Sequence, residues 1–426
     1  MNNLIFGVKT ALQRDWAWKR ADGLFRLPNR QVNPNDLGDV VFHYSIPAIQ
    51  ETGNGAVELA SEIKSAKHQL DGGELLVSKL NPRKGCVILS QKQDYPTVAS
   101  TEFVVLVPKQ IDPDFAAFLY QSHQVRESIS SVVQSVTRSH QRANPSDITK
   151  LWFPIPPLPT QRRIAAYLDR ETAQIDALVA EKETLLRLLE EKRASLISHA
   201  VTRGLHPKAK LKPSGIPWLG DVPEHWELKE LRYLVDPKRQ VMYGIVLPGP
   251  HIEDGSPIIK GGDVKPHRLN PDTLSRTTHE IAARHGRSSL RAGDILFSIR
   301  GSIGDVAIVP PSLDGANITQ DAARIAPREG IDRDWLFWSL QSRRAYCSLE
   351  VGSLGAAVRG INIRDLKRLW LALPPAKEQE TIGIYLTRQM QNMVGLEADI
   401  KTSITLLCEK RSSLISAAVT GEMAVP

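Results

Sequence analysis

A basic turn in each half of the chain carries residue types that contact nucleic acid. Each turn directly follows a short apolar run: SKLNPRKG at residues 78–85 and SIRGSIG at residues 298–304. Their polar candidates are Lys79, Asn81, Arg83, Lys84, Arg300 and Ser302. Arginine and lysine reach phosphates or guanine edges, and asparagine pairs bidentately with adenine. The turns therefore predict contacts to DNA, with a solvated basic hairpin as the alternative interpretation.

A second pair of candidate loops lies just upstream of an asparagine that recurs in both halves. These loops read SVTRSHQRA at residues 135–143 and SLGAAVR at residues 353–359, and their candidate residues are Arg138, His140, Arg142 and Arg359. Small residues mixed with arginine suit a loop that approaches a sugar-phosphate backbone closely. They equally suit an ordinary surface turn.

Signatures of catalysis are missing from the sequence. It contains no G-x-x-x-x-G-K-[S/T] phosphate loop, no H-E-x-x-H zinc motif and no Asn-Pro-Pro-aromatic turn that could grip an amino group for methylation. Glu62 and Lys64 form an E-x-K triplet, which arises by chance in any charged chain. We therefore predict no catalytic residue and no metal site, and binding is the favoured activity.

The composition narrows the class of protein. A chain of 426 residues with a formal net charge of +7 has room for two or three domains and suits a polyanionic partner without requiring one. Cys86, Cys347 and Cys408 lack C-x-x-C spacing, so neither a disulfide framework nor a cysteine zinc site is indicated. The sequence shows neither a signal peptide nor an apolar run long enough for a membrane span. We expect a soluble cytoplasmic protein that binds no cofactor.

The elements that must position the candidate loops are duplicated. Residues 144–202 and 362–420 align at a constant offset of 218 residues, with 26 identities in 59 positions. In each copy a Pro-Pro pair ends a strand or loop, because the residue before proline is pushed out of the α region. A long helical pattern follows. A weaker match at an offset of 220 joins GELLVS at residues 73–78 with GDILFS at residues 293–298, so the whole chain is one unit duplicated.

Both long helices carry a narrow apolar seam with the alternating four-and-three spacing of a coiled coil. The seam consists of Ile164, Leu168, Ile175, Leu178, Leu185, Leu189 and Leu196 in the first copy and of Ile382, Leu386, Met393, Leu396, Ile400, Leu407 and Leu414 in the second. Equal length and register favour antiparallel pairing of the two helices. Packing of each helix on its own domain is the alternative. Gly395 is expected to weaken the second helix by roughly 1 kcal/mol relative to alanine.

Each globular unit is predicted to be mixed and mostly β, which makes the expected fold class α+β. The runs at residues 85–90, 103–107, 294–299 and 305–309 are bounded by Gly, Pro, Asn or Asp and predict strands. Helices are expected at residues 112–122 and 332–342, each with aspartate as the N-cap. The basic, Pro- and Gly-containing residues 206–216 are typical of a flexible joint. The expected divisions are residues 1–143, 144–205, 206–361 and 362–426.

Four stretches give the chain a resemblance to a known family. They are PPLPTQRRIAAYLD at residues 156–169, EKRASLISHAVT at residues 191–202, SGIPWLGDVPEHW at residues 214–226 and GGELLVSKLNPRKG at residues 72–85. Over essentially its whole length the chain resembles the specificity subunit of type I DNA restriction-modification systems. The motifs are specific, because the helix repeats and the openings of both domains occur in order.

The resemblance implies that each globular unit is a target-recognition domain that reads one half of a bipartite DNA sequence. It also implies an antiparallel coiled coil that fixes the spacing of the half-sites and docks methyltransferase subunits. Two such modification subunits would methylate adenine with S-adenosylmethionine, and restriction subunits would add cleavage that uses ATP and Mg. The chain itself would be non-catalytic.

Two interpretations from other classes remain open at this point. The coiled coil could serve a protein–protein scaffold without DNA specificity, or one globular unit could hold an unrecognised active site. Binding that falls steeply with salt would argue against the scaffold. Activity of the isolated chain would support the enzyme.

Overall fold

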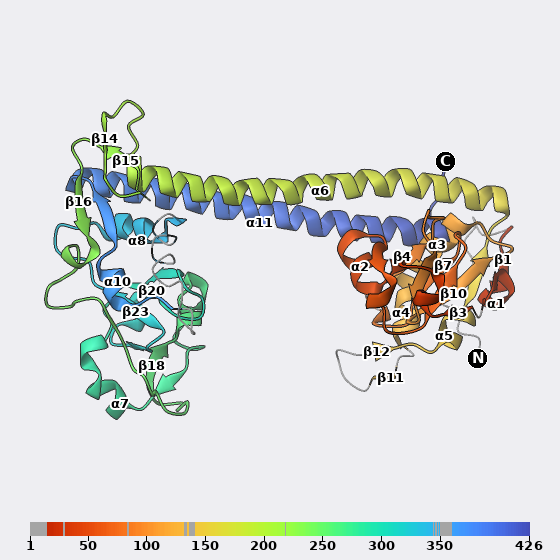
Figure 1. Ribbon diagram of the computed structural model, residues 1–426, viewed down its shortest axis with the longest axis horizontal. Helices are drawn as coiled ribbons and strands as arrows, with labels where there is room; N and C mark the ends of the chain where they lie inside the picture. Colours follow the sequence, from red (N-terminus) through yellow and green to blue (C-terminus); the bar gives the residue numbers. More distant parts are fainter. Residues whose placement is uncertain are drawn as a thin grey trace. The chain divides into compact units, whose positions relative to one another are not determined.

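The computed structural model describes residues 15–28, 30–82, 85–131, 134–135, 141–217, 219–343, 345, 347, 349 and 360–426 (Figure 1). Its contacts divide into two compact units. Unit 1 consists of Met1–Glu183 and Lys401–Pro426, and unit 2 is Thr184–Ile400. Each unit therefore combines one globular segment with half of each long helix. The divisions expected from the sequence differ, because they treat each long helix as a separate segment.

Unit 1 is built on two main sheets. The first is antiparallel, in the order β2 (Phe25–Arg26), β10 (Phe103–Pro108), β7 (Leu75–Ser78) and β8 (Val87–Leu89). The second has the order β3 (Gln31–Val32), β6 (Lys67–Leu70), β9 (Thr97–Ser100), β4 (Val40–Tyr44) and β5 (Ala56–Leu59), with β9 and β4 parallel. Shorter pairs join β1 (Ala17–Arg20) to β13 (Trp152–Ile155) and β11 (Gln134–Ser135) to β12 (Gln141–Arg142). The short helices are α1 (Ala21–Leu24), α2 (Ile46–Thr52), α3 (Pro113–Gln121), α4 (His123–Ser131) and α5 (Pro145–Thr149).

Unit 2 repeats this plan with shorter strands. Its antiparallel sheet has the order β17 (Met242–Tyr243), β23 (Ala322–Ile325), β20 (Ile295–Ser298) and β21 (Val306–Ile308). A second sheet has the order β19 (Arg276–Thr277), β18 (Ser256–Ile259) and β22 (Asn317–Ile318), with β18 and β22 parallel. β16 (Glu227–Glu230) pairs with β24 (Trp370–Leu373). The short helices are α7 (His279–Arg284), α8 (Arg333–Gln341) and α10 (Ile363–Lys367).

The shared strand order confirms the internal repeat and the α+β class. The four predicted strands are present as β8, β10, β20 and β21. Both predicted N-caps are also confirmed, because Asp112 Oδ1 accepts a hydrogen bond from Phe115 N at 3.1 Å and Asp332 Oδ1 accepts one from Trp335 N at 2.7 Å. A side-chain acceptor at this position satisfies a backbone N–H that has no partner within the helix.

The two long helices are α6 (Leu158–Arg203) and α11 (Ala376–Thr420). In unit 1 the start of α6 and the end of α11 share one core, which contains Leu168 and Ile415. In unit 2 the end of α6 and the start of α11 share another, which contains Val201 and Leu386. The helices therefore pair antiparallel, as the repeat predicted. None of the helices in the described part of the chain combines the length and the hydropathy that a membrane span requires.

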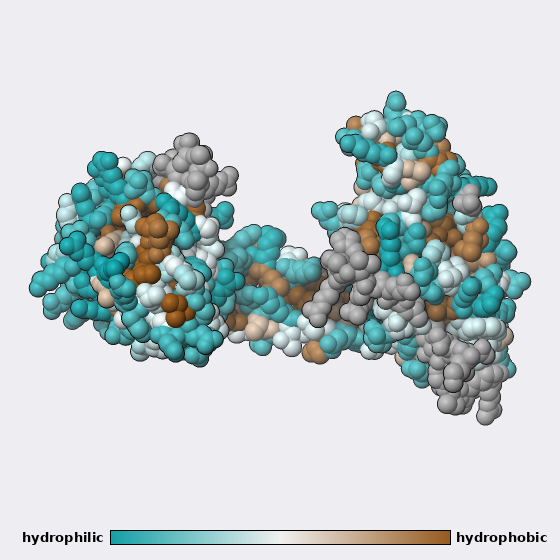
Figure 2. Space-filling view, turned by 90° about the horizontal axis from the view of Figure 1, so that it is seen from below, coloured by the Kyte–Doolittle hydropathy of each residue, from teal (hydrophilic) through white to brown (hydrophobic). Residues whose placement is uncertain are grey.

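The predicted seam is only partly buried. Its buried members are Ile164, Leu168, Ile175, Ile382, Leu386, Met393 and Ile400, and its half-buried members are Leu189, Leu196, Leu407 and Leu414. Leu178, Leu185 and Leu396 are instead 44–46% exposed, so their assignment to a buried seam was wrong. An α-helix drifts by about 20° per heptad against a 3.5-residue repeat, so spacing alone does not show which leucines face the partner helix. Figure 2 shows such apolar side chains on the surface of the long helices.

A repeated glutamine ties the start of each long helix to its globular segment. Gln161 Nε2 donates to Pro156 O at 2.8 Å, and Gln161 Oε1 accepts from Asp112 N at 2.7 Å. Gln379 makes the same two contacts, with Pro374 O and Asp332 N, both at 2.9 Å. Both glutamines are buried. These bonds explain why the Pro-Pro pair and the glutamine recur at a fixed spacing.

The predicted flexible joint at residues 206–216 is wrong in its second half. There, β14 (Leu211–Pro213) pairs antiparallel with β15 (Asp221–Pro223), and Lys212 Nζ donates to Glu224 O at 2.6 Å. Trp226, which follows, is buried in the core of unit 2. Proline content suggested a linker, but a two-stranded pair has edges on which proline is tolerated.

Candidate nucleic-acid interface

The basic turn of unit 1 begins where β7 ends. Ser78 Oγ donates to Leu80 O at 2.9 Å and accepts from Leu80 N at 3.1 Å, which closes the turn. Lys79 N donates to Glu102 O at 2.8 Å, just before β10. Asn81 has φ 50°, a left-handed conformation that asparagine adopts more readily than most residues. Backbone bonds thus hold the half-buried Lys79 at the end of the sheet.

The turn of unit 2 is built in the same way. Ser298 Oγ donates to Arg300 O at 3.0 Å, and the backbone N–H groups of Ile299 and Arg300 donate to Asp321 O at 2.9 and 3.2 Å. Arg300 is exposed and Ser302 is half-buried. Asp321 therefore occupies the place that Glu102 has in unit 1.

Each turn meets the segment that carries the second predicted loop. In unit 1 Ala143 N donates to Lys79 O at 2.9 Å, and Leu80 forms a β-bridge with Arg142. In unit 2 Ile361 N donates to Ile299 O at 2.9 Å, and Arg300 forms a β-bridge with Gly360. Among the predicted contacts, Lys79, Asn81 and Arg142 come together in unit 1, and Arg300 and Ser302 in unit 2. Arg83, Lys84, Arg138, His140 and Arg359 lie outside the described residues and stay predictions.

A depression of about 510 Å³ opens beside the turn of unit 1, and its lining includes Gln31, His68, Lys79, Glu102 and Arg142. Arg142 Nε donates to Glu102 Oε2 at 2.9 Å, and Arg142 Nη2 donates to Glu102 Oε1 at 2.5 Å. Burial, and to a lesser degree the charge of Lys79, lowers the pKa of His68. The neutral imidazole that this favours can both donate and accept a hydrogen bond. The depression thus offers cations, donors and acceptors of the kind that contact phosphates and base edges.

Glu102, His68 and Gln31 were not predicted from the sequence. The sequence did contain a signal for Glu102. Glu102 immediately precedes β10, and Asp321 immediately precedes the equivalent strand β23, so an alignment of the two halves at this point would have paired the two acidic residues. His68 and Gln31 face each other through the pairing of β3 with β6. No sequence motif predicts this pairing of Gln31 with His68, because the register of β3 and β6 depends on the whole sheet.

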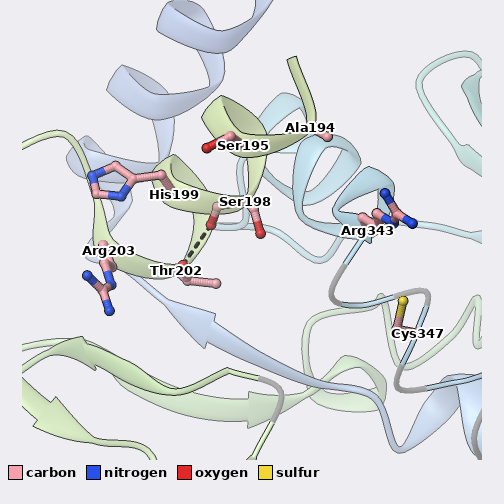
Figure 3. Close-up of a pocket in the computed structure, with 8 residues that line it drawn as sticks. All are labelled: Ala194, Ser195, Ser198, His199, Thr202, Arg203, Arg343 and Cys347. Atoms are coloured by element: carbon pink, nitrogen blue, oxygen red, sulfur yellow. Dashed lines mark hydrogen bonds between the residues drawn. The ribbon is translucent and has the colours of Figure 1, made fainter. Parts of the chain in front are cut away.

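A separate cavity of about 550 Å³ lies at the end of α6 in unit 2 (Figure 3). It is lined by Ala194, Ser195, Ser198, His199, Thr202, Arg203, Arg343 and Cys347. Thr202 Oγ1 donates to Ser198 O at 2.7 Å, a bond within the helix. None of the predicted DNA contacts that the structure describes lines this cavity. Nor do the described residues contain a group of three or more His, Cys, Asp or Glu side chains that could hold a metal ion.

Known proteins are similar to this chain in both sequence and fold. The family "Type I restriction modification DNA specificity domain" matches residues 14–187 and 253–406. The specificity subunit of the type I restriction enzyme EcoBI from Escherichia coli is 29% identical over 301 residues, which span 70% of this chain and 63% of that protein. The putative type I restriction enzyme MjaX specificity subunit from Methanocaldococcus jannaschii is 24% identical over 392 residues, or 88% of this chain and 84% of that one.

Two solved structures support the fold. A chain from a type I R-M system, studied for complex assembly and conformational transition, has a TM-score of 0.75 at 19% identity, over 97% of this chain and 100% of that chain. The HsdS subunit from Thermoanaerobacter tengcongensis has a TM-score of 0.53 at 19% identity, over 96% and 98%. Because the family match takes in most of both halves, the chain belongs to the family of type I restriction-modification DNA specificity proteins.

Proposed function

We propose that this chain is the specificity subunit of a type I restriction-modification complex, and that its two globular segments each read one half of a bipartite DNA target. One observation carries the proposal: both units contain the same site. In each unit a turn closed by a serine hydroxyl follows an inner strand of the sheet, β7 or β20, and this turn forms a β-bridge with the segment that leads into the repeat. Two similar readers joined by two long helices suit two short sequences separated by an unread spacer. The helices would set the length of that spacer.

The chain would dock modification subunits through its repeats. Leu178 and Leu396 are equivalent in the repeat, as are Leu188 and Leu406, and all four are between 45% and 59% exposed. The equivalent residues Trp152 and Trp370 are also exposed. Large apolar residues that remain exposed in both copies are typical of binding sites for a partner. We infer two equivalent sites, and hence two copies of one modification subunit.

Catalysis would reside in the partners. In this proposal modification subunits methylate adenine with S-adenosylmethionine, and restriction subunits cleave DNA with ATP and Mg, in the cytoplasm. The chain contributes sequence recognition and spacing. Its own described residues offer cations and hydrogen-bonding groups at the candidate interface, which are suited to binding.

Sequencing of methylated adenines tests the proposed function. DNA is compared from cells that express a type I modification subunit able to form a complex with this chain, with and without the chain. A bipartite motif with a fixed spacer that appears only with the chain is the expected result. Unchanged methylation with an active modification subunit would refute the specificity role and favour a scaffold.

Docking is tested separately by co-purification. Replacing Leu178 and Leu396 with glutamate should weaken the complex with the modification subunit, because each charge would be buried at the interface. Leu247→Glu is the control, since Leu247 is 83% exposed but lies outside the repeats. Equal complex formation by both variants would exclude the exposed leucines as the docking site.

A further inference from the structure

We propose that Arg142, held in place by Glu102, reads a guanine in the half-site bound by unit 1. This inference rests on the proposed function and adds a residue and a base to it. The alternative is that Arg142 contacts a phosphate, where it would carry no sequence information. Three features of the site favour the base.

The first feature is the orientation of the guanidinium. Glu102 accepts hydrogen bonds from Nε and from Nη2 of Arg142. This uses one edge of the planar group and leaves the N–H bonds of Nη1 and the second N–H of Nη2. Of these three N–H bonds, one on Nη1 and the one on Nη2 point the same way and form a fork that matches O6 and N7 of guanine, the commonest base-specific contact in the major groove.

The second feature is the unequal exposure of the pair. The Arg142 side chain is 67% exposed, whereas that of Glu102 is 26% exposed. Glu102 is therefore the inner partner, and it presents the arginine to solvent. An ion pair this exposed contributes little to folding stability, so fixing the plane of the arginine is the better account of it. A fixed side chain also loses less conformational freedom when it binds.

The third feature is the rigid backbone on both sides of the pair. The carbonyl of Glu102 accepts from Lys79 N, and Arg142 bridges Leu80 in the same turn. Both ends of the ion pair are thus tied to the end of β7. Lys79 lies in the same depression and is placed to contact a neighbouring phosphate. A site of this kind holds its contacting atoms in a constant position, which discrimination between bases requires.

The described residues of unit 2 do not repeat this arrangement. The position of Arg142 is taken by Gly360 and that of Glu102 by Asp321. A Cβ at Gly360 would lie 3.3 Å from Arg300 Cγ, so the glycine leaves room for the side chain of Arg300. The contact made by Arg142 and Glu102 therefore belongs to the half-site of unit 1, and the two half-sites are expected to differ.

Three variants of the complex with the modification subunit test the proposal by sequencing of methylated adenines. Arg142→Ala should lose the requirement for guanine at one position, with discrimination reduced by about 5- to 150-fold. Arg142→Lys should weaken this requirement, because lysine keeps the charge but lacks the planar fork. The matched control is Arg20→Ala, which removes an exposed arginine bound bidentately to Asp22 outside the depression and should leave the motif unchanged.

A second measurement uses the unaltered complex. Each guanine of the target is replaced in turn by 7-deazaguanine, which lacks the N7 acceptor. Binding should weaken at one guanine, by a smaller factor because the O6 acceptor remains, and Arg142→Ala should be insensitive at that position. This measurement tests the proposal even if a variant fails to fold. If 7-deazaguanine weakens DNA binding by the unaltered complex at none of the guanines, the proposal is overturned.

Other outcomes also overturn it. Uniformly weaker methylation in Arg142→Ala, restored by lysine and without a change of motif, would assign Arg142 to a phosphate. A target without a G·C pair would exclude the contact at once. In either case the bipartite motif of the unaltered chain would still stand, whereas absence of any motif would refute the proposed function itself.

Discussion

Two glycines of α11 should respond in opposite directions to the same substitution. Gly395 lies in open space, with nothing within 4 Å of a Cβ added to it. A Cβ at Gly383 would lie 2.8 Å from Asp332 Oδ1 and 3.1 Å from Trp335 N. Asp332 Oδ1 is the oxygen that caps α8 by accepting from Trp335 N. Alanine at Gly383 therefore has to displace a helix cap, and alanine at Gly395 displaces nothing.

The expected magnitudes follow from these surroundings. Gly395→Ala should raise the free energy of unfolding by about 1 kcal/mol, the difference in helix propensity. Gly383→Ala gains the same amount but weakens a cap worth about 0.5–2 kcal/mol and crowds a packed contact at a cost of about 1–3 kcal/mol. The net effect is a loss of about 0.5–4 kcal/mol.

Thermal unfolding of the full chain, followed by circular dichroism, measures both variants. Both glycines belong to unit 2, so they report on the same transition. For a unit of this size 1 kcal/mol corresponds to about 2–4 °C in Tm. Gly395→Ala should therefore unfold at a higher temperature than the unaltered chain and Gly383→Ala at a lower one. Equal stabilisation by both would show that the start of α8 does not press against α11.

Three further predictions concern buried polar groups. Gln379→Leu should lower the free energy of unfolding by about 1–3 kcal/mol, because Asp332 N and Pro374 O lose their partner; an unchanged denaturation midpoint would contradict this. Arg239→Met should lower the free energy of unfolding by about 3–5 kcal/mol, because the buried carboxylate of Asp294 loses its ion-pair partner. The double variant Arg239→Met/Asp294→Leu should recover part of that loss in the same assay. Burial raises the pKa of Cys86 from its ordinary 9.0 to about 11, so the folded protein should be alkylated at the exposed Cys347 and Cys408 but not at Cys86. Because the pKa of Cys86 is higher in the folded state than in the unfolded state, the free energy of unfolding should fall as the pH rises from about 9 to 11. Mass spectrometry checks the alkylation pattern, and unfolding measured across this pH range checks the loss of stability.

Local signals predicted the elements whose hydrogen bonds are local. Asp112 and Asp332 cap helices three residues away, and that bond depends on the neighbouring backbone alone. The long helices likewise follow from a pattern that repeats along one segment. In these cases sequence spacing and spatial distance carry the same information.

Features that depend on distant pairing were not predictable in this way. Glu102 and Arg142 meet because separate strands pair around β7, so no spacing along the chain points to them. Composition was misleading at residues 211–213, where a proline-containing segment pairs with β15. Burial of the seam also depended on what packs against it, which left Leu178 exposed and Leu168 buried within the same helix.

The two copies differ in a way that separates framework from recognition. Positions that hold the backbone in place are the same in both units: Ser78 and Ser298 close the turns, and Gln161 and Gln379 bind the helix starts. Positions of the turn and of the segment that pairs with it have diverged: Lys79 corresponds to the buried Ile299, Leu80 to Arg300, and Arg142 to Gly360.

This division has a physical cause. The turn is fixed through serine hydroxyls and main-chain groups, so the side chains it presents can change without loss of the turn. A buried glutamine that satisfies two backbone groups has no such freedom, because any replacement leaves those groups unpaired. Duplication of one stable unit could therefore yield two domains with different base contacts on the same frame.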